Sequence, residues 1–263
     1  MDYTLGSLQL DERLMSFVLK LVLFGLLILI LTIGLLSTQI SLFIINRIAI
    51  IVLLLSGVLA FHAMWLGLLG SGVAIFNGLF QVTEVTEGID LFIYIVSILV
   101  LLMSETRSYK LQLNKEELNS SSNVEENIIG DYHQRDSLKA LEEYPLILLF
   151  SILGITFLIS SYDLFTIFLS IELQSFALYI LATIFRDSES AVSAGLKYFL
   201  LGNLASAIIL FGVGFVYINT GLTSFEGLYI LGSTTIINQY FEFSVLLIII
   251  GLLFKVAAAP YHN

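Results

Sequence analysis

Long apolar runs separated by shorter polar segments dominate this chain. About 20 apolar residues, at a rise of 1.5 Å per residue, are enough for a helix to cross the hydrocarbon core of a bilayer. The pattern therefore predicts an all-α, polytopic membrane protein with about seven transmembrane helices. We place them at Phe17–Leu36, Ile48–Leu68, Ile89–Met103, Pro145–Ser161, Leu164–Phe185, Ala191–Ile218 and Phe243–Ala259.

Polar segments divide the chain into three regions. Residues 1–103 carry three helices, residues 104–143 form a polar, acidic segment, and residues 144–263 carry the remaining helices. The middle region holds nine acidic and five basic side chains, so we expect a solvated loop, with a partner-docking segment as the alternative. In the last region, Asp163 or a preceding serine is expected to cap the fifth helix. Pro260 predicts that the seventh helix is broken at membrane depth.

Composition agrees with a membrane protein and excludes several kinds of site. Hydrophobic residues make up 58% of the chain and charged residues 12%, against about 25% charged residues in soluble domains. The absence of cysteine excludes disulfides and thiolate ligands for an iron–sulfur cluster. His62, His133 and His262 are scattered and predict no metal site. The net charge of −10 offers no basic surface for nucleic acid.

The basic residues in the loops predict the orientation of the chain. Loops after the first, third and fifth helices carry seven of them, whereas the opposite side carries only Arg13. Because lysine and arginine accumulate on the cytoplasmic or matrix side, the N-terminus is expected on the other side. The seven residues are Arg47, Arg107, Lys110, Lys115, Arg135, Lys139 and Arg186.

Charged residues inside the apolar runs are the main functional candidates. Glu172 lies nine residues after Asp163, which places it roughly 13 Å into its helix, close to the membrane midplane. Lys255 lies deep in the seventh helix between LIIIGLLF and VAAAP, without polar neighbours. Charges in the membrane are costly and usually serve transport, proton relay or pairing. We therefore expect Glu172 and Lys255 to pair, with Gln174 and Ser175 as further hydrogen-bonding candidates.

The other lysines within helices are open to more than one interpretation. Lys20 lies within a turn of its helix start and is expected to extend to the interface. Lys197 lies six residues into the sixth helix, where it can either extend to the interface or act as a third relay residue. Gly202 and Ser206 lie four residues apart in the same helix, a spacing that allows close helix packing.

The segments that carry these charges resemble a known family. EYPLILLFSILGITFLISSYDLFTIFLSIELQSFALYILA, SAGLKYFLLGNLASAIILFG and GLLFKVAAAPYHN are similar, in this order, to the NADH dehydrogenase subunit 2 family. These proteins are antiporter-like membrane subunits of respiratory complex I. The resemblance is specific from about Glu143 to Asn263 and weaker before it. It implies the first half of an antiporter-like, inverted-repeat fold.

The resemblance also implies a function and a set of site residues. It implies a proton-translocating membrane-arm subunit of an NADH:ubiquinone oxidoreductase in the mitochondrial inner membrane. The relay residues that match the family are Glu172, Lys197 and Lys255, and Pro260 matches the broken helix. NADH, FMN, iron–sulfur clusters and ubiquinone are expected on other subunits, so that this chain belongs to a translocase but carries no redox catalysis. Bound lipids and other membrane-arm subunits are expected partners.

One departure from the family leaves alternatives open. The family continues beyond the PYH motif into a second half, which this sequence does not contain. We expect a second polypeptide to supply that half, with truncation of the sequence as the alternative. The alternative functions are a subunit of a cation/proton antiporter and a structural half-subunit that does not pump.

Overall fold

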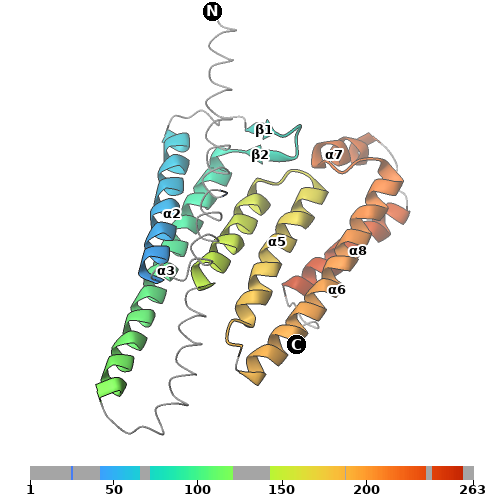
Figure 1. Ribbon diagram of the computed structural model, residues 1–263. Helices are drawn as coiled ribbons and strands as arrows, with labels where there is room; N and C mark the ends of the chain where they lie inside the picture. Colours follow the sequence, from blue (N-terminus) through green and yellow to red (C-terminus); the bar gives the residue numbers. More distant parts are fainter. Residues whose placement is uncertain are drawn as a thin grey trace, which may run out of the picture.

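A computed structural model describes most of the chain as helices (Figure 1). The described residues are 25, 42–65, 72–120, 143–186, 188–234 and 239–256. The elements in chain order are α2 (Leu42–Trp65), β1 (Val73–Ile75), β2 (Phe80–Val82), α3 (Glu84–Ser120), a helix at Glu143–Ser160, α5 (Leu164–Ala182), α6 (Glu189–Thr220), α7 (Phe225–Thr234) and α8 (Gln239–Lys255).

Five of the described helices are long and apolar enough to cross a membrane. They are Ile44–Trp65, Glu84–Thr106, Glu143–Ser160, Leu164–Ala182 and Glu189–Thr220. The prediction of a mostly helical, multi-pass membrane protein is therefore confirmed. The expected first helix and Pro260 lie outside the described residues, so the count of seven and the helix break stay predictions.

Two local predictions were wrong. The third helix was predicted to end at Met103, but α3 continues to Ser120. Residues 104–120 are polar, but they include Glu, Lys and Leu, which favour helix, so the helix continues beyond its apolar part. The all-α prediction also missed the antiparallel hairpin of β1 and β2. Its turn contains Asn77 and Gly78 with positive φ, a pair typical of tight hairpins.

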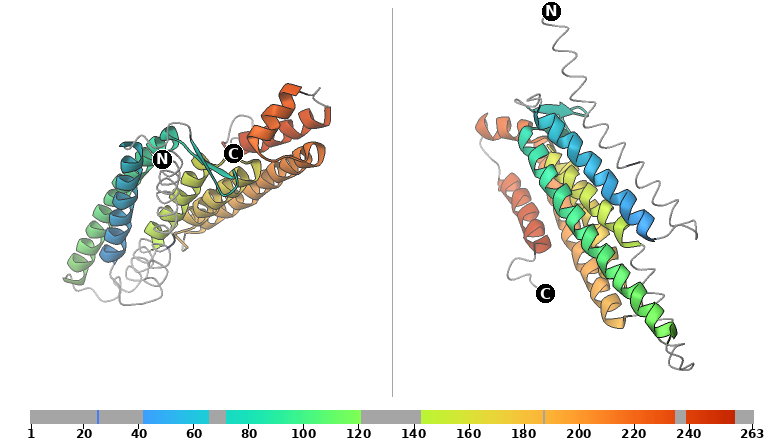
Figure 2. Two further views of the ribbon diagram at one scale, coloured as in Figure 1. Left: turned by 90° about the horizontal axis from the view of Figure 1, so that it is seen from above. Right: turned by 90° about the vertical axis from the view of Figure 1, so that its left-hand side faces the viewer.

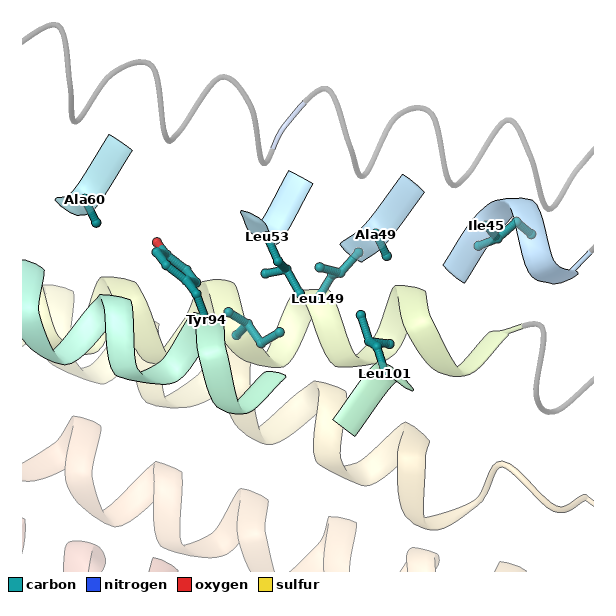
Figure 3. Close-up of a cluster of buried hydrophobic side chains, with 8 residues drawn as sticks. Ile45, Ala49, Leu53, Ala60, Tyr94, Leu101 and Leu149 are labelled. Atoms are coloured by element: carbon teal, nitrogen blue, oxygen red, sulfur yellow. The ribbon is translucent and has the colours of Figure 1, made fainter. Parts of the chain in front are cut away.

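The N-terminal helices pack around an apolar core. α2 and α3 lie side by side next to the Glu143–Ser160 helix (Figures 1 and 2). Figure 3 shows the core, in which Leu53 of α2 and Tyr94 of α3 meet Leu149 of the Glu143–Ser160 helix. The other buried members of this cluster are Ile45, Ala49, Ala60, Leu101 and Ile152.

A second group consists of α5, α6 and α8, with α6 in contact with both other helices. Small residues allow the close approach of α6 and α8. A Cβ added to Gly251 of α8 would lie 3.0 Å from the carbonyl oxygen of Ala205, and one added to Gly212 of α6 would lie 3.0 Å from that of Ser244. The two helices therefore run antiparallel with their backbones nearly in contact.

Backbone contacts tie the two groups together at one end. The hairpin and α7 lie at the same end of the molecule, at the top of Figure 1. The amide of Tyr162 donates to the carbonyl of Leu79 at 2.9 Å, and that of Leu164 donates to the carbonyl of Thr223 at 3.1 Å. The start of α5 is thus held between the hairpin and the loop before α7.

Candidate functional site

Two charged side chains from α5 and α8 form a mostly buried ion pair. Nζ of Lys255 lies 2.6 Å from Oε1 of Glu172, although the two residues are 83 positions apart in the sequence. The side chains are 12% and 15% exposed, respectively. Because a mid-membrane charge is expensive without a partner, mutual pairing accounts for the tolerance of both charges.

The start of α5 fixes the depth of Glu172. Asp163 is the N-cap of α5, as the sequence predicted among its alternatives, and it accepts a hydrogen bond from the amide of Phe165 at 2.8 Å. Its other carboxylate oxygen accepts from the hydroxyl of Thr223 at 2.6 Å. Glu172 is the ninth of the 19 residues in α5, about 12 Å along the helix axis from its start. The cap therefore sets Glu172 near the middle of the span.

Close packing of α8 brings Lys255 within reach. Gly251 lies one turn before Lys255 and rests on Ala205 and Ile209 of α6, where any larger side chain would collide. Lys255 is the last helical residue of α8 as the structure describes it. Its flexible stem can then extend past α6 to the carboxylate on α5.

Two serine hydroxyls complete the environment of the pair. Ser206 of α6 donates to Oε1 of Glu172, and it also lies 2.9 Å from the carbonyl oxygen of Gly202. Ser175 of α5 accepts from Nζ of Lys255 at 3.1 Å and donates to the carbonyl of Ile171 at 2.6 Å. The sequence predicts Ser175 as a hydrogen-bonding candidate, whereas it indicates only a helix-packing role for Ser206. Only the Gly202–Ser206 spacing indicated that this face of α6 lies against another helix.

This arrangement is chemically suited to moving a proton. Two charges about 4 Å apart interact by about 4 kcal/mol at an effective dielectric constant near 20. A lysine on a flexible stem can lose its proton in an apolar setting, whereas an arginine cannot. A carboxylate within hydrogen-bond distance can accept that proton directly.

Lys197 is not brought to this pair. It is exposed, and it forms no hydrogen bond or ion pair with any residue that the structure describes. It precedes Ser206 by nine residues, about 180° around α6, so the two side chains leave the helix on opposite sides. α6 has 32 residues, about 48 Å, and Lys197 lies only about 12 Å from its N-terminus. This position is near the expected membrane interface.

Within the described ranges, no group of three or more His, Cys, Asp or Glu side chains is placed to hold a metal ion. The hydrogen bonds of the ion pair join one carboxylate, one amine and two hydroxyls, all contributed by α5, α6 and α8, and Tyr179 of α5 lies beside Ser175.

Comparison with known proteins shows what the chain that carries this site is similar to. Residues 161–263 match the family described as NADH:quinone oxidoreductase/Mrp antiporter, transmembrane. NADH-ubiquinone oxidoreductase chain 2 of Rhizopus oryzae is 56% identical over 243 residues, which are 92% of this chain and 45% of that protein. The chain resembles NADH dehydrogenase subunit 2. NADH-quinone oxidoreductase subunit N of Erythrobacter litoralis is also similar, with 43% identity over 48% of this chain and 26% of its own length.

Solved structures share the fold. A chain of respiratory complex I from Thermus thermophilus superposes with a TM-score of 0.62 at 23% identity, over 92% of this chain and 45% of its own length. A chain of an archaeal membrane-bound sulfane sulfur reductase gives a TM-score of 0.67 at 21% identity, over 95% of this chain and 46% of its own length. The present chain spans about half the length of NADH-ubiquinone oxidoreductase chain 2 of R. oryzae.

Proposed function

We propose that this chain is part of a proton-translocating membrane-arm subunit of an NADH:ubiquinone oxidoreductase. The observation that carries the proposal is the ion pair of Glu172 and Lys255, which joins α8 to the middle of α5. Similarity to NADH-ubiquinone oxidoreductase chain 2 over 92% of the chain supports the choice of complex. The complex would be the translocase, and its redox chemistry would take place on other subunits.

Proton movement would use the mutual dependence of the two charges. While Glu172 is ionised, it favours the protonated form of Lys255, because opposite charges in a poorly solvated site stabilise each other. Any event that moves or neutralises Glu172 removes this stabilisation and releases the lysine proton. Lys197 would serve as a third relay residue near the interface, and a helix break at Pro260 would open the site to water.

The proposed setting is the mitochondrial inner membrane, with the N-terminus on the intermembrane-space side. The relative from R. oryzae supports the organelle, and the loop charges support the orientation. NADH, FMN, iron–sulfur clusters and ubiquinone would be bound by other subunits, and lipids would surround the exposed apolar faces.

The decisive experiment substitutes Lys255 by methionine, which keeps most of the apolar stem and removes the charge. The complex containing Lys255→Met is reconstituted into vesicles, and NADH oxidation and proton uptake are measured together. We expect assembly to be retained and proton transfer to fall by at least tenfold, the equivalent of about 1.4 kcal/mol. Arg186→Met is the matched control, because it removes an exposed cation of similar length. Unchanged proton transfer in assembled Lys255→Met would reject the role of the pair.

The family match itself favours one alternative, because its description also includes Mrp antiporters. A cation/proton antiporter subunit would exchange ions across vesicles without NADH. Its purified complex would lack flavin and iron–sulfur absorbance, whereas the proposed complex would show both. A structural half-subunit would retain normal pumping after Lys255→Met.

A further inference from the structure

Ser206 presents one proton to two acceptors at the ion pair. Its Oγ lies within hydrogen-bond distance of Oε1 of Glu172 and of the carbonyl oxygen of Gly202, the latter at 2.9 Å. A hydroxyl has one O–H donor and two acceptor lone pairs, so it can donate to only one of these oxygens at a time. Ser206 is 6% exposed, which leaves little competition from bulk water.

The protonation of Glu172 decides which acceptor is used. An ionised carboxylate is the stronger acceptor, so Ser206 donates to Glu172 in that state. When Glu172 carries a proton on Oε1, this O–H donates to Oγ of Ser206. The hydroxyl of Ser206 then turns to the carbonyl of Gly202. Neither state leaves the hydroxyl or the carboxyl group without a partner, and no bond within Ser206 is broken.

Ser175 lies on the lysine side of the pair, where it contacts Lys255 rather than Glu172. Its O–H is directed at the carbonyl of Ile171 at 2.6 Å, and its lone pair accepts from Nζ of Lys255 at 3.1 Å. Both the ammonium and the neutral amine of a lysine carry N–H donors, so this contact persists in either protonation state. The two serines therefore differ: Ser175 holds Lys255 in place, while Ser206 follows the charge of Glu172.

We propose that Ser206 is a positioning residue whose hydroxyl switches between Glu172 and Gly202 as Glu172 gains and loses its proton. The inference rests on the proton-transfer role proposed above. It adds that α6, through Ser206, adjusts the hydrogen bonding of Glu172 during proton transfer. The switch lets Glu172 change its charge without leaving a buried polar group unsatisfied. Proton exchange with Lys255 then proceeds without any movement of the helix backbones.

The test combines proton transfer with infrared spectroscopy of the whole complex. Difference spectra against Glu172→Gln identify the C=O band of protonated Glu172. In Ser206→Ala we expect this band to shift to higher wavenumber, because the carboxyl group loses a hydrogen-bond partner. Proton transfer should fall roughly tenfold, the effect of losing one charge-assisted hydrogen bond. Ser206→Thr should restore both values toward those of the unaltered complex.

Ser170→Ala is the matched control. Ser170 is buried in α5 and donates to the carbonyl four residues earlier, at 2.7 Å, but it does not contact the ion pair. This variant should leave both the band and proton transfer unchanged. Should Ser206→Ala fail to assemble, Ser206→Cys keeps the size with a weaker donor and should give smaller changes in the same direction.

The outcomes separate the two proposals. If assembled Glu172→Gln pumps normally, the proton-transfer role of the pair is rejected, and the switch with it. If Glu172→Gln abolishes pumping but Ser206→Ala leaves both the infrared band and proton transfer unchanged, only the switch is rejected. An equal loss in Ser170→Ala and Ser206→Ala would also reject it, since the effect would then be one of helix packing.

Discussion

Two ion pairs of this protein have similar geometry but occupy different surroundings. Glu172 and Lys255 lie 2.6 Å apart and mostly buried, whereas Glu143 and Arg186 lie 2.9 Å apart at the end of the helices. Arg186 is 75% exposed. Water and ions screen the exposed pair, so its contribution to stability is small. The buried pair has lost most of its hydration, and each charge therefore depends on the other.

This difference in burial is why we propose the buried pair, and not the exposed one, as the proton relay. At the exposed end, neutralising one partner leaves the other in contact with water, so the two protonation states are hardly coupled. Neutralising either Glu172 or Lys255 instead leaves the other charge uncompensated in an apolar region. In the proposed relay, a proton that moves in one partner would change the free energy of the other by several kcal/mol. Four predictions test this difference, beginning with the largest effect.

The buried pair should show strong coupling in a double-mutant cycle. Glu172→Gln and Lys255→Met, each alone, should destabilise the complex by about 3–5 kcal/mol, because each leaves an unpaired buried charge. The double variant should be much less destabilised than the sum. Chemical denaturation of the assembled complexes measures the effect. Additive losses would mean that the two charges do not stabilise each other.

The second prediction concerns the helix contact that positions Lys255. Gly251→Val adds a branched side chain where even a Cβ would lie 2.5 Å from Ile209 and 3.0 Å from the carbonyl of Ala205. We expect a loss of about 1–3 kcal/mol from overpacking, together with weaker proton transfer because α8 is displaced from α6. Gly232→Val in α7 is the control, since nothing lies within 4 Å of a Cβ at that position. Equal effects of both substitutions would show that the packing of α6 on α8 is not important for the site.

Much of the fold was predictable because each membrane helix appears in the sequence as a long apolar run. The five spans found in the structure follow apolar runs whose composition leaves few alternatives. The polar end of α3 was missed because the prediction followed the apolar run, which marks only the part of a helix that spans the membrane. The helix itself continues as long as its residues have sufficient helix propensity. The hairpin was missed although Asn77–Gly78 is a strong turn pair, because the flanking strands have only three residues each.

The site was predictable in its charges but not in its hydroxyls. Glu172 and Lys255 stand out because an apolar run makes any charge conspicuous. Ser206 does not stand out, since serine is common in membrane helices and usually bonds to its own backbone. Its contact with Glu172 depends on how α5 and α6 are rotated against each other. The same rotation leaves Lys197 on the opposite side of α6, a fact that helical depth alone could not reveal.

The third prediction concerns the cap that sets the depth of Glu172. Asp163→Ala removes the acceptor of the Phe165 amide and of the Thr223 hydroxyl, and it should cost about 1 kcal/mol, the usual effect of losing an N-cap. Asp163→Asn keeps an acceptor oxygen and should cost less. Thermal denaturation of the Asp163→Ala and Asp163→Asn complexes measures the loss of stability in each. Indistinguishable losses would mean that the charge of Asp163, rather than its cap, stabilises this end of α5.

The smallest effect is expected at the exposed pair, and it completes the comparison. Arg186→Gln removes two hydrogen bonds of 2.9 Å to Glu143, yet it should cost at most about 1 kcal/mol, because water replaces them. Raising the salt concentration should reduce even this difference, whereas it should hardly change the coupling between Glu172 and Lys255. Denaturation curves of Arg186→Gln and Lys255→Met at low and high salt measure both. A salt-insensitive loss of several kcal/mol in Arg186→Gln would overturn the distinction, because position along the helix would then not determine the strength of an ion pair.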